Sequence, residues 1–348
     1  MQAIRLTAWE RPAELVEIPM PEPGPGEVLV RVAGAGLCHS DLHLMHWRAG
    51  ALPYDLPFTL GHEVAGTVAA LGPGAEALEP GEPVLVYGPW GCGRCRACSV
   101  GAEHLCESPP RGRGAGLGRD GGLAEYVVVP SPRLTVPLDG LDPVAAAPLA
   151  DAGLTPYHAI RRAQGILRPG AGAIVIGVGG LGHVAVQLLK GLGRTRVVAV
   201  DRRDEALELA TRGGADVALQ AAGLTAGELR LAAGPRGAAL VLDCVGTDET
   251  LSLAAGAVSP GGHVSVLGLS GGTFPMRFGG VPLETSVIFS NWGTRAELAE
   301  VVALARDGAI SVDVERISLS GVPTAYERLA GGGGHGRLVA VPAEGGSS

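Results

Sequence analysis

Apolar and polar positions divide the chain into segments of two kinds. Up to about residue 150, short alternating runs such as EVLVRVAGAG and HEVAGTVAAL are interrupted by Pro and Gly, which predicts the strands of an irregular β domain. From about residue 153, continuous apolar runs such as AIVIG, RVVAVD and AALVLD alternate with helical stretches. This alternation predicts an α/β domain whose doubly wound parallel sheet is covered by helices on both faces.

The pattern changes back after residue 287. The segment SNWGTRAELAEVVALARDGAI predicts an amphipathic helix, and the closing GRLVAVP predicts a final strand. We therefore expect the parallel-sheet domain at residues 153–287, inserted between residues 1–152 and 288–348 of a mainly β domain. The length of 348 residues agrees with two domains, because one hydrophobic core seldom serves so long a chain.

Composition and charge narrow the classes of function. With 46% hydrophobic and 18% charged residues, the composition is typical of a globular protein. The net charge of -8 disfavours a nucleic-acid surface and suits a protein that acts on small molecules. The N-terminal segment has no apolar core behind a basic start, and no later apolar run is long enough to span a bilayer. We expect a soluble, cytoplasmic protein with no membrane partner.

A glycine-rich turn follows the first strand of the expected parallel sheet. Gly177 permits a tight turn, Gly179 lets the backbone approach a pyrophosphate, and Gly182 lets the next helix pack close to the strand. The helix N-terminus then offers free N–H groups to phosphates. A turn that binds nothing is the alternative, but strand, turn, helix and a later acid favour a dinucleotide site. The candidate turn residues are Gly177, Gly179, Gly180, Leu181 and Gly182.

The second apolar strand of this region ends at Asp201, nineteen residues after Gly182. An acid at this place accepts hydrogen bonds from the adenosine ribose of NAD and would repel the 2'-phosphate of NADP. Arg202 and Arg203 follow directly, and an arginine there can stack on adenine or reach a phosphate. We expect NAD, with NADP left open.

Four cysteines lie close together with the spacing C-x2-C-x2-C-x7-C, in a lobe at about residues 90–108. Four thiolates complete a tetrahedral zinc site and leave no position for a substrate, so the pattern predicts a structural zinc. An iron–sulfur cluster uses the same ligands and is the alternative; a zinc-ribbon module for nucleic acid is disfavoured by the acidic charge. The cysteines are Cys92, Cys95, Cys98 and Cys106.

A second set of candidate ligands is dispersed along the chain: Cys38 in GLCHSDLH, His62 and Glu63 in LGHEVAG, and Asp151 in PLADAGLTPYHA. One thiolate, one imidazole and one carboxylate would leave an open fourth position on zinc, as catalysis requires. Each residue also has a simpler explanation, because Cys38 suits a buried apolar position, His62 a core histidine and Asp151 a helix N-cap. Spacing alone leaves both explanations open.

Taken together, several segments resemble the zinc-containing medium-chain alcohol dehydrogenases, in the order of that family and over essentially the whole chain. They are GLCHSD, GHEVAGTV, the four-cysteine lobe, GGLAEY, DAGLTPYHA, VIGVGGLG, NWGTRAEL and GRLVAVP. The resemblance implies a GroES-like catalytic domain around an inserted Rossmann domain. It also implies that Cys38, His62 and Asp151 bind a catalytic zinc and that Glu63 can approach the metal. Asp151 departs from the cysteine of the horse-liver type and resembles the bacterial secondary-alcohol branch.

The resemblance also implies roles in proton transfer and cofactor binding. Ser40 would pass the proton of the alcohol toward the cofactor ribose, and His43 would hand it to solvent. Other matched positions suggest contacts with the pyrophosphate and the nicotinamide of the cofactor. These are His39 and Arg337 for the pyrophosphate and Thr155 and Leu269 for the nicotinamide. Besides the matched positions, Asp201, Arg202 and Val245 are further cofactor candidates. Tyr54 and Trp292 lie near ligand-bearing segments and are the candidate walls of a substrate pocket.

We therefore expect an enzyme that oxidises a primary or secondary alcohol, or reduces the aldehyde or ketone, by hydride transfer with NAD(P) and two zinc ions per subunit. The expected partner is a small-molecule alcohol or carbonyl substrate, and the expected assembly is a homodimer or homotetramer. A polyol or amino-alcohol dehydrogenase of the same family is the first alternative. A zinc-free quinone or enoyl reductase and a non-catalytic binding protein are the others.

Overall fold

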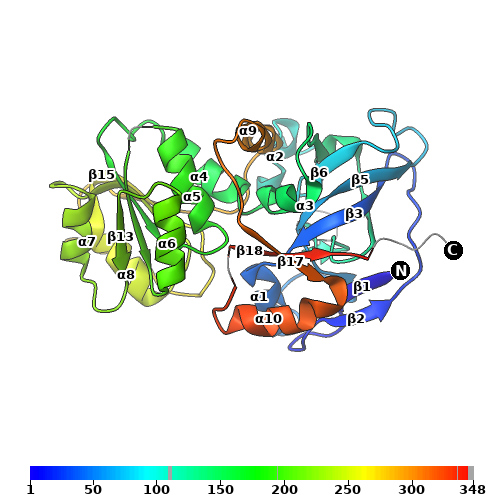
Figure 1. Cartoon of the computed structure of the whole chain (residues 1–348), viewed down its shortest axis with the longest axis horizontal. Helices are drawn as coiled ribbons and strands as arrows, with labels where there is room; N and C mark the ends of the chain where they lie inside the picture. The colour runs from blue at the N-terminus through cyan, green and yellow to red at the C-terminus, as the bar shows by residue number, and fades with distance from the viewer. Residues whose placement is uncertain (109–111, 194, 335, 344–348) are drawn as a thin grey trace. The chain divides into compact units, whose positions relative to one another are not determined.

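The chain forms two compact units in a computed structural model (Figure 1). The first unit comprises Met1–Asp151, Trp292–Arg306 and Val312–Ser348, and the second comprises Ala152–Asn291 and Asp307–Ser311. The structure describes residues 1–108, 112–193, 195–334 and 336–343.

The second unit contains a six-stranded sheet in which every neighbouring pair is parallel, in the order β13-β12-β11-β14-β15-β16. Its central strands are buried on both faces, which explains their continuous apolar sequences. The last strand continues through Phe289, so the sheet extends beyond residue 287. The strands are β11 (Gly172–Ile176), β12 (Arg196–Asp201), β13 (Val217–Gln220), β14 (Ala238–Asp243), β15 (Val258–Val266) and β16 (Ser286–Phe289).

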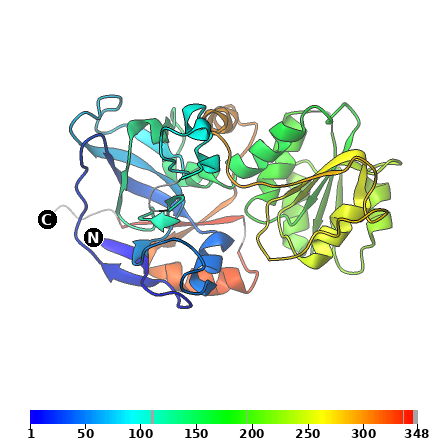
Figure 2. The same ribbon diagram turned by 180° about the vertical axis from the view of Figure 1, so that it is seen from behind.

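Helices cover both faces of this sheet, with α5 and α6 on one side and α7 and α8 on the other (Figures 1 and 2). Helix α7 begins with a capping box, because Thr225 Oγ1 accepts from the Glu228 N–H at 3.2 Å and Glu228 Oε2 accepts from the Thr225 N–H at 2.9 Å. The predicted doubly wound fold is therefore confirmed. The helices are α4 (Leu154–Ala163), α5 (Gly182–Gly191), α6 (Asp204–Arg212), α7 (Ala226–Ala233) and α8 (Asp248–Ala257).

The first unit is mainly β, as predicted. Its largest sheet has the strand order β10-β6-β5-β3-β18-β17, with β9 also paired to β3, and smaller sheets have the orders β2-β1-β4 and β7-β8. The strands are β1 (Gln2–Leu6), β2 (Glu14–Glu17), β3 (Val28–Gly36), β4 (Phe58–Thr59), β5 (Glu63–Leu71), β6 (Pro83–Val86), β7 (Gly114–Ala115), β8 (Gly118–Arg119), β9 (Tyr126–Val129), β10 (Thr135–Pro137), β17 (Val314–Ser318) and β18 (Arg337–Val341).

Short helices connect these strands and pack beside them. The α-helices are α1 (His39–His46), α2 (Arg96–Ser99), α3 (Pro143–Ala146), α9 (Arg295–Arg306) and α10 (Val322–Ala330). The 3-10 helices are η1 (Glu103–Leu105), η2 (Pro132–Leu134), η3 (Ala147–Ala150) and η4 (Leu319–Gly321). The predicted helix near the return to the first unit is α9, and the predicted final strand is β18.

Strand register in the large sheet brings distant segments together at one of its ends. Strand β3 runs antiparallel to β5 with Gly36 opposite Glu63, and antiparallel to β18 with Gly36 opposite Val339. The end of β3 therefore lies beside the beginnings of β5 and β18. Cys38, His62 and Arg337 come from these three strand ends.

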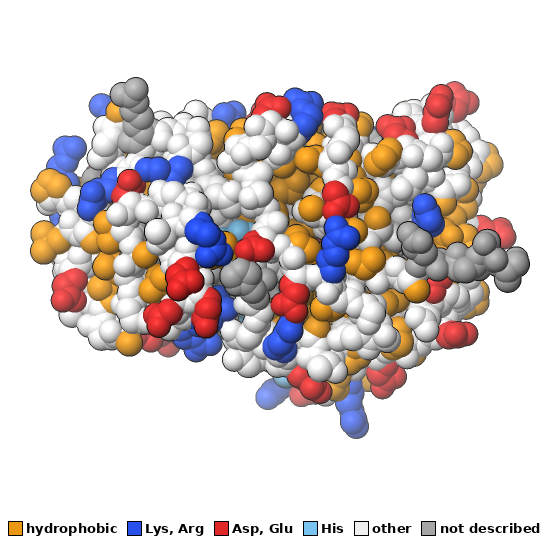
Figure 3. All heavy atoms as spheres, viewed as in Figure 1, with side chains coloured by type: hydrophobic (Ala, Val, Ile, Leu, Met, Phe, Trp, Pro, Cys, Tyr) orange, Lys and Arg blue, Asp and Glu red, His pale blue; other side chains and the backbone are white. Residues whose placement is uncertain are grey.

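Two features of the structure concern nucleic acid and membrane as partners. On the face in Figure 3, acidic and basic side chains are interspersed and do not gather into one basic patch. Among the described residues, no helix combines the length and the apolar character needed to cross a bilayer.

Candidate active site

Three side chains with metal-ligating atoms converge at the end of the large sheet described above. Cys38, His62 and Asp151 are all buried, and their ligand atoms lie within 4.8 Å of one another. Cys38 Sγ is 3.9 Å from Asp151 Oδ2, and His62 Nε2 is 3.6 Å from the same oxygen. Strand ends supply the first two residues, and η3, which packs against β5, ends directly before the third.

This cluster fits zinc. Zinc–ligand bonds of about 2.0–2.3 Å in a tetrahedron place neighbouring ligand atoms about 3.3–3.8 Å apart, close to the separations found here. Burial alone would lower the pKa of His62, but the nearby carboxylates of Asp151 and Asp41 raise it well above its usual value. A thiolate, a neutral imidazole and a carboxylate are suitable ligands for a divalent cation, which would compete with protons for these groups. Three protein ligands leave one tetrahedral position open.

A further carboxylate lies next to the ring of His62. Asp41, in the first turn of α1, is fully buried, and its Oδ1 lies 3.4 Å from His62 Nδ1. Its Oδ2 accepts a hydrogen bond from the Cys38 N–H at 3.0 Å. Metal-binding histidines commonly direct their second ring nitrogen at such a carboxylate, which fixes the orientation of the ring. Asp41 thus contacts two of the three candidate ligands.

Glu63, the residue after His62, forms a buried ion pair with Arg337. Arg337 Nε donates to Glu63 Oε2 at 2.8 Å, and Nη2 donates to Oε1 at 2.5 Å. Burial raises the pKa of Glu63, although the neighbouring guanidinium acts in the opposite direction. A side chain at Gly36 would overlap the carboxylate, so this glycine makes the room for it. In the structure, Arg337 therefore pairs with Glu63. The roles expected from the sequence, Arg337 at the pyrophosphate and Glu63 at the metal, stay predictions.

The candidate proton relay lies on helix α1, next to the metal ligands. Ser40 Oγ is 3.5 Å from Cys38 Sγ. His43 is half-buried one turn later, and burial, followed by the nearby His46, lowers its pKa. His39, the candidate pyrophosphate contact at the start of α1, is exposed. The hydroxyl is thus close to the cluster, while the relay itself stays a prediction.

Of the two aromatic residues predicted to line a pocket, Trp292 lies beside the metal ligands. Its buried ring meets the His62 ring edge to face, with centroids 6.0 Å apart. Gly88 allows this packing, since a Cβ there would sit 3.1 Å from the indole. Tyr54 is partly exposed and packs edge to face on Phe58 at 6.2 Å, so its place in a pocket stays a prediction.

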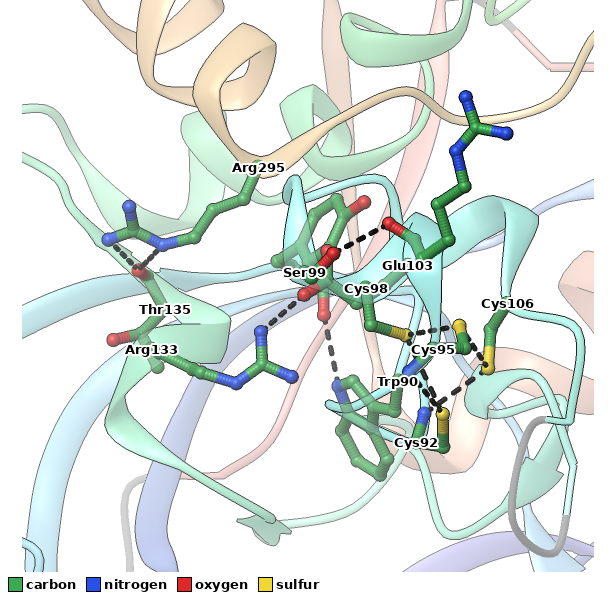
Figure 4. Close-up of polar contacts among 12 residues, drawn as sticks. Trp90, Cys92, Cys95, Cys98, Ser99, Glu103, Cys106, Arg133, Thr135 and Arg295 are labelled. Atoms are coloured by element: carbon green, nitrogen blue, oxygen red, sulfur yellow. Dashed lines mark hydrogen bonds and ion pairs between the residues drawn. The ribbon is translucent and has the colours of Figure 1, made fainter.

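The four cysteines of the lobe also converge (Figure 4). Their Sγ atoms are separated by 3.5 Å between Cys95 and Cys98, 3.9 Å between Cys95 and Cys106, and 4.0 Å between Cys92 and Cys98. A tetrahedron of zinc–sulfur bonds of about 2.3 Å has edges of about 3.8 Å, so the group fits zinc. Gly91 permits the approach, because a side chain there would overlap Cys98 Sγ.

Backbone N–H groups favour the thiolate form of one cysteine in this lobe. Those of Cys98 and Glu107 lower the pKa of the Cys95 thiol to about 6, which favours the thiolate near neutral pH. Burial raises the pKa of Cys98 to about 12, so its thiolate needs a positive partner. Beside the cysteines, the buried Glu103 carboxylate is held by Arg133 (Figure 4). The lobe is closed by its own four ligands and offers no open position.

The glycine-rich turn of the second unit has the predicted strand–turn–helix context. Gly177 has φ +86, where a Cβ would be strained, and a side chain at Gly182 would overlap the Gly177 carbonyl oxygen. Asp201, at the end of β12, accepts a 2.7 Å hydrogen bond from the Val178 N–H through Oδ2 and one of 2.9 Å from the Arg203 N–H through Oδ1. The Asp201 carboxylate therefore stabilises the turn through its hydrogen bond with Val178. Arg202, the next residue, is exposed.

The remaining cofactor candidates lie in the same unit. Val245 packs over the turn, since a Cβ at Gly177 would lie 2.5 Å from its Cγ2, and Leu269 is 57% exposed after β15. Thr155 is buried in the first turn of α4. Gly179 has open space where a Cβ would be, which suits the close approach of a ligand. Their contacts with a cofactor stay predictions, as do those of Gly180 and Leu181.

The chain is similar to known proteins over almost its whole length. The sequence profile of the alcohol dehydrogenase GroES-like domain matches residues 24–140, and that of the zinc-binding dehydrogenases matches residues 180–307. An NAD-dependent alcohol dehydrogenase of Sulfurisphaera tokodaii is 36% identical over 98% of this chain and 100% of its own. The alcohol dehydrogenase structure from Aeropyrum pernix has a TM-score of 0.90 and 36% identity, over 98% of this chain and 100% of its own. The chain belongs to the zinc-containing medium-chain alcohol dehydrogenase family.

This zinc-binding dehydrogenase thus has the predicted family and fold class. Another relative, a D-arabinose 1-dehydrogenase (NADP(+)) of Saccharolobus solfataricus, is 34% identical over 98% of this chain and 97% of its own. Close relatives therefore differ in both substrate and cofactor. The Cys38, His62 and Asp151 group and the four-cysteine group are the two sets of described residues whose geometry could hold the family's zinc.

Two residues at the metal ligands did not emerge from the sequence. Asp41 had a local signal, because an acid at the third position of a helix that begins after Cys38 can bond back to the N-terminal backbone. Tyr326, whose hydroxyl donates to Asp41 Oδ2 at 2.9 Å, had none, because 285 positions separate the two residues.

Proposed function

We propose that the protein oxidises primary or secondary alcohols to aldehydes or ketones, and catalyses the reverse reduction, by transferring hydride to and from NAD. The observation that carries the proposal is the buried cluster of Cys38, His62 and Asp151. These three ligands would leave one position of a tetrahedral zinc open. An open position marks a catalytic metal site, whereas the four-cysteine lobe is of the closed, structural type. The named NAD-dependent alcohol dehydrogenase relatives support the same reaction.

The residues around the cluster would bind the metal and move the proton. When bound, zinc supplies the positive charge that lowers the pKa of an alcohol hydroxyl, and NAD supplies the hydride acceptor. Ser40 Oγ, 3.5 Å from the Cys38 sulfur, is a hydroxyl placed to accept the alcohol proton. His43 lies three positions later on the same face of α1, and its lowered pKa keeps the imidazole neutral and ready to accept that proton near neutral pH.

We propose NAD as the preferred cofactor because of Asp201. A ribose 2'-hydroxyl can donate to a carboxylate at the end of β12, whereas a 2'-phosphate would be repelled by it. Arg203 offsets part of that charge, with Nε 3.4 Å from Asp201 Oδ1, and Arg202 is exposed beside it. Weak activity with NADP is therefore compatible with the proposal, and a preference for NADP would contradict this part of it.

The direct test follows NADH formation by absorbance, with NAD and then NADP, across primary alcohols, secondary alcohols and adjacent diols. Each assay is repeated after treatment with a chelator and again after zinc is restored. Turnover of simple alcohols that the chelator abolishes and zinc restores is the expected result. Turnover confined to diols or sugars would favour a polyol dehydrogenase, and the D-arabinose dehydrogenase relative gives that alternative its support. Activity that is insensitive to the chelator would contradict the zinc mechanism.

We further propose that the chain forms a homodimer or homotetramer. Large apolar side chains are exposed around β16, an edge strand whose neighbour among the described strands is β15; they include Met276, Phe278, Leu283 and Phe289. Unpaired, uncharged strand edges with apolar neighbours are sites of association between chains. Light scattering should give two or four times the chain mass of 35.1 kDa, and a single chain mass would contradict this proposal.

We also propose the cytoplasm as the compartment. All six cysteines are free of disulfides, and five of them lie in the two ligand clusters. Thiols persist in that state in a reducing environment. Cell fractionation that recovers the protein outside the cytoplasm would contradict this assignment.

A further inference from the structure

Tyr326, on a helix distant in sequence, contacts the Asp41 carboxylate next to the candidate zinc ligands. Tyr326 lies on α10, which packs against α1, and its side chain is 4% exposed. Its hydroxyl donates a 2.9 Å hydrogen bond to Oδ2 of Asp41, which is fully buried. Burial, together with the Asp41 charge, raises the pKa of this tyrosine well above its usual value, so the hydroxyl keeps its proton and acts as a donor.

Asp41 in turn contacts two of the three candidate ligands, Cys38 and His62. Its Oδ2 also accepts from the Cys38 N–H at 3.0 Å, and its Oδ1 faces His62 Nδ1 at 3.4 Å. Two donors on Oδ2 therefore fix the rotation of the carboxylate, and that rotation points Oδ1 at the histidine ring. With one donor removed, the carboxylate retains only the Cys38 N–H to hold Oδ2.

Packing of the aromatic ring alone does not explain why position 326 is a tyrosine. A phenylalanine would fill the same volume between α10 and α1, so the hydroxyl adds only a directional bond to the carboxylate. Hydrogen bonds to charged, buried groups are stronger and more directional than bonds between neutral groups. The contact therefore bears on the geometry of the metal ligands more than on packing.

We infer that Tyr326 is a positioning residue of the catalytic zinc site, a role that rests on the proposed function. Its hydroxyl sets the orientation of Asp41, and Asp41 sets the orientation of the His62 ring. Loss of groups that orient metal ligands costs about 10–100-fold in metal affinity. Because Tyr326 acts one contact further out, we expect an effect near the lower end, about tenfold.

The test compares Tyr326→Phe with Thr135→Val, two variants that each lose one buried hydroxyl in the first unit. Thr135 Oγ1 donates to the Pro132 carbonyl at 2.7 Å and does not belong to either ligand cluster. For both variants and the wild type, zinc content is measured first, and the release of zinc to a chromophoric chelator is then followed over time. We expect Tyr326→Phe to release its catalytic zinc about tenfold faster than the wild type, and Thr135→Val to release it at the wild-type rate.

A second background separates positioning from general loosening of the fold. In Asp41→Asn, the further change Tyr326→Phe should have little additional effect on zinc release, because the hydroxyl acts through the carboxylate. Equal release rates for Tyr326→Phe and the wild type, or fully additive effects with Asp41→Asn, would overturn the inference alone. A wild-type protein with no second, releasable zinc would overturn the proposed function together with this inference.

Discussion

The ion pair between Glu63 and Arg337 gives a sharp prediction about stability. The carboxylate is 0% exposed and the guanidinium 5% exposed, and two hydrogen bonds of 2.8 and 2.5 Å join them. Arg337→Met keeps most of the side-chain length but leaves a buried carboxylate without its cation. Breaking a buried pair in this way costs about 3–5 kcal/mol, because the remaining charge stays desolvated.

The expected loss translates into a large change in thermal unfolding. For a unit of roughly 200 residues, 1 kcal/mol corresponds to about 2–4 °C in Tm, so Arg337→Met should lower Tm by about 6 °C or more. Calorimetry at one scan rate, without cofactor and with equal zinc for all variants, measures the shift. The double variant Glu63→Gln with Arg337→Met should recover part of the loss, because it removes the stranded charge.

Arg316 provides a matched control for this experiment. Its guanidinium Nη2 lies 2.6 Å from Asp142 Oδ2, but the two side chains are 60% and 48% exposed. Exposed pairs contribute about 0–1 kcal/mol, so Arg316→Met should shift Tm by no more than about 4 °C. If Arg337→Met shifted Tm no more than Arg316→Met does, the buried pair would not have the importance that its geometry indicates.

Three further predictions concern proton transfer, the cofactor turn and pH. His43→Gln should lower kcat for alcohol oxidation by up to about 10²-fold and make it rise more steeply with pH in steady-state assays, because solvent must then take the proton directly; an unchanged pH profile would argue against the relay. Gly182→Ala should weaken NAD binding about tenfold or more by calorimetric titration, because its Cβ would overlap the Gly177 carbonyl, whereas Gly191→Ala, with open space around it, should bind as the wild type does. Burial alone would raise the pKa of Asp216, but the Val197 N–H and Lys190 lower it, so its folded-state pKa lies below the unfolded one. The carboxylate therefore stabilises the fold above about pH 4 and loses that effect below it, and the Tm difference between wild type and Asp216→Asn should shrink on acidification; a constant difference would contradict this.

The sequence predicted the parallel-sheet unit because burial there leaves a direct signature. The strand GAIVI of β11 is buried at every position, and RVVAVD of β12 at all but the first, so each contains a continuous apolar stretch. The edge strands β13 and β16 have only four residues each and are partly exposed, so they carry no comparable pattern. The end of the sheet at Phe289 was therefore not visible in the hydrophobic pattern.

The candidate site was predictable only in part. Spacing left Cys38, His62 and Asp151 open to simpler explanations, and family resemblance joined them into one site. The structure supplies the physical reason for their meeting, because the antiparallel register of β3 and β5 sets Gly36 opposite Glu63. The zinc site of the four-cysteine lobe was predictable from spacing alone, since its ligands are close in sequence.

Contacts that depend on tertiary packing could not be read from the chain. The pairing of Arg337 with Glu63 joins residues 274 positions apart. The hydrogen bond from Tyr326 to Asp41 likewise depends on α10 packing against α1. A buried tyrosine or arginine has no local pattern that distinguishes it from an ordinary core or surface residue, so only the fold reveals these partners.

Cys38 is assigned to a catalytic zinc site and Cys95 to a structural one. The most direct measurement combines zinc content, NADH formation and Tm for the wild type, Cys38→Ala and Cys95→Ala. We predict two zinc ions per wild-type chain, and one zinc with no turnover but near-normal Tm and NAD binding for Cys38→Ala. Cys95→Ala should lose the other zinc and unfold at a lower temperature, because a structural zinc contributes directly to folding. Full activity and two bound zinc ions in Cys38→Ala would show that Cys38 is not a ligand of a catalytic zinc.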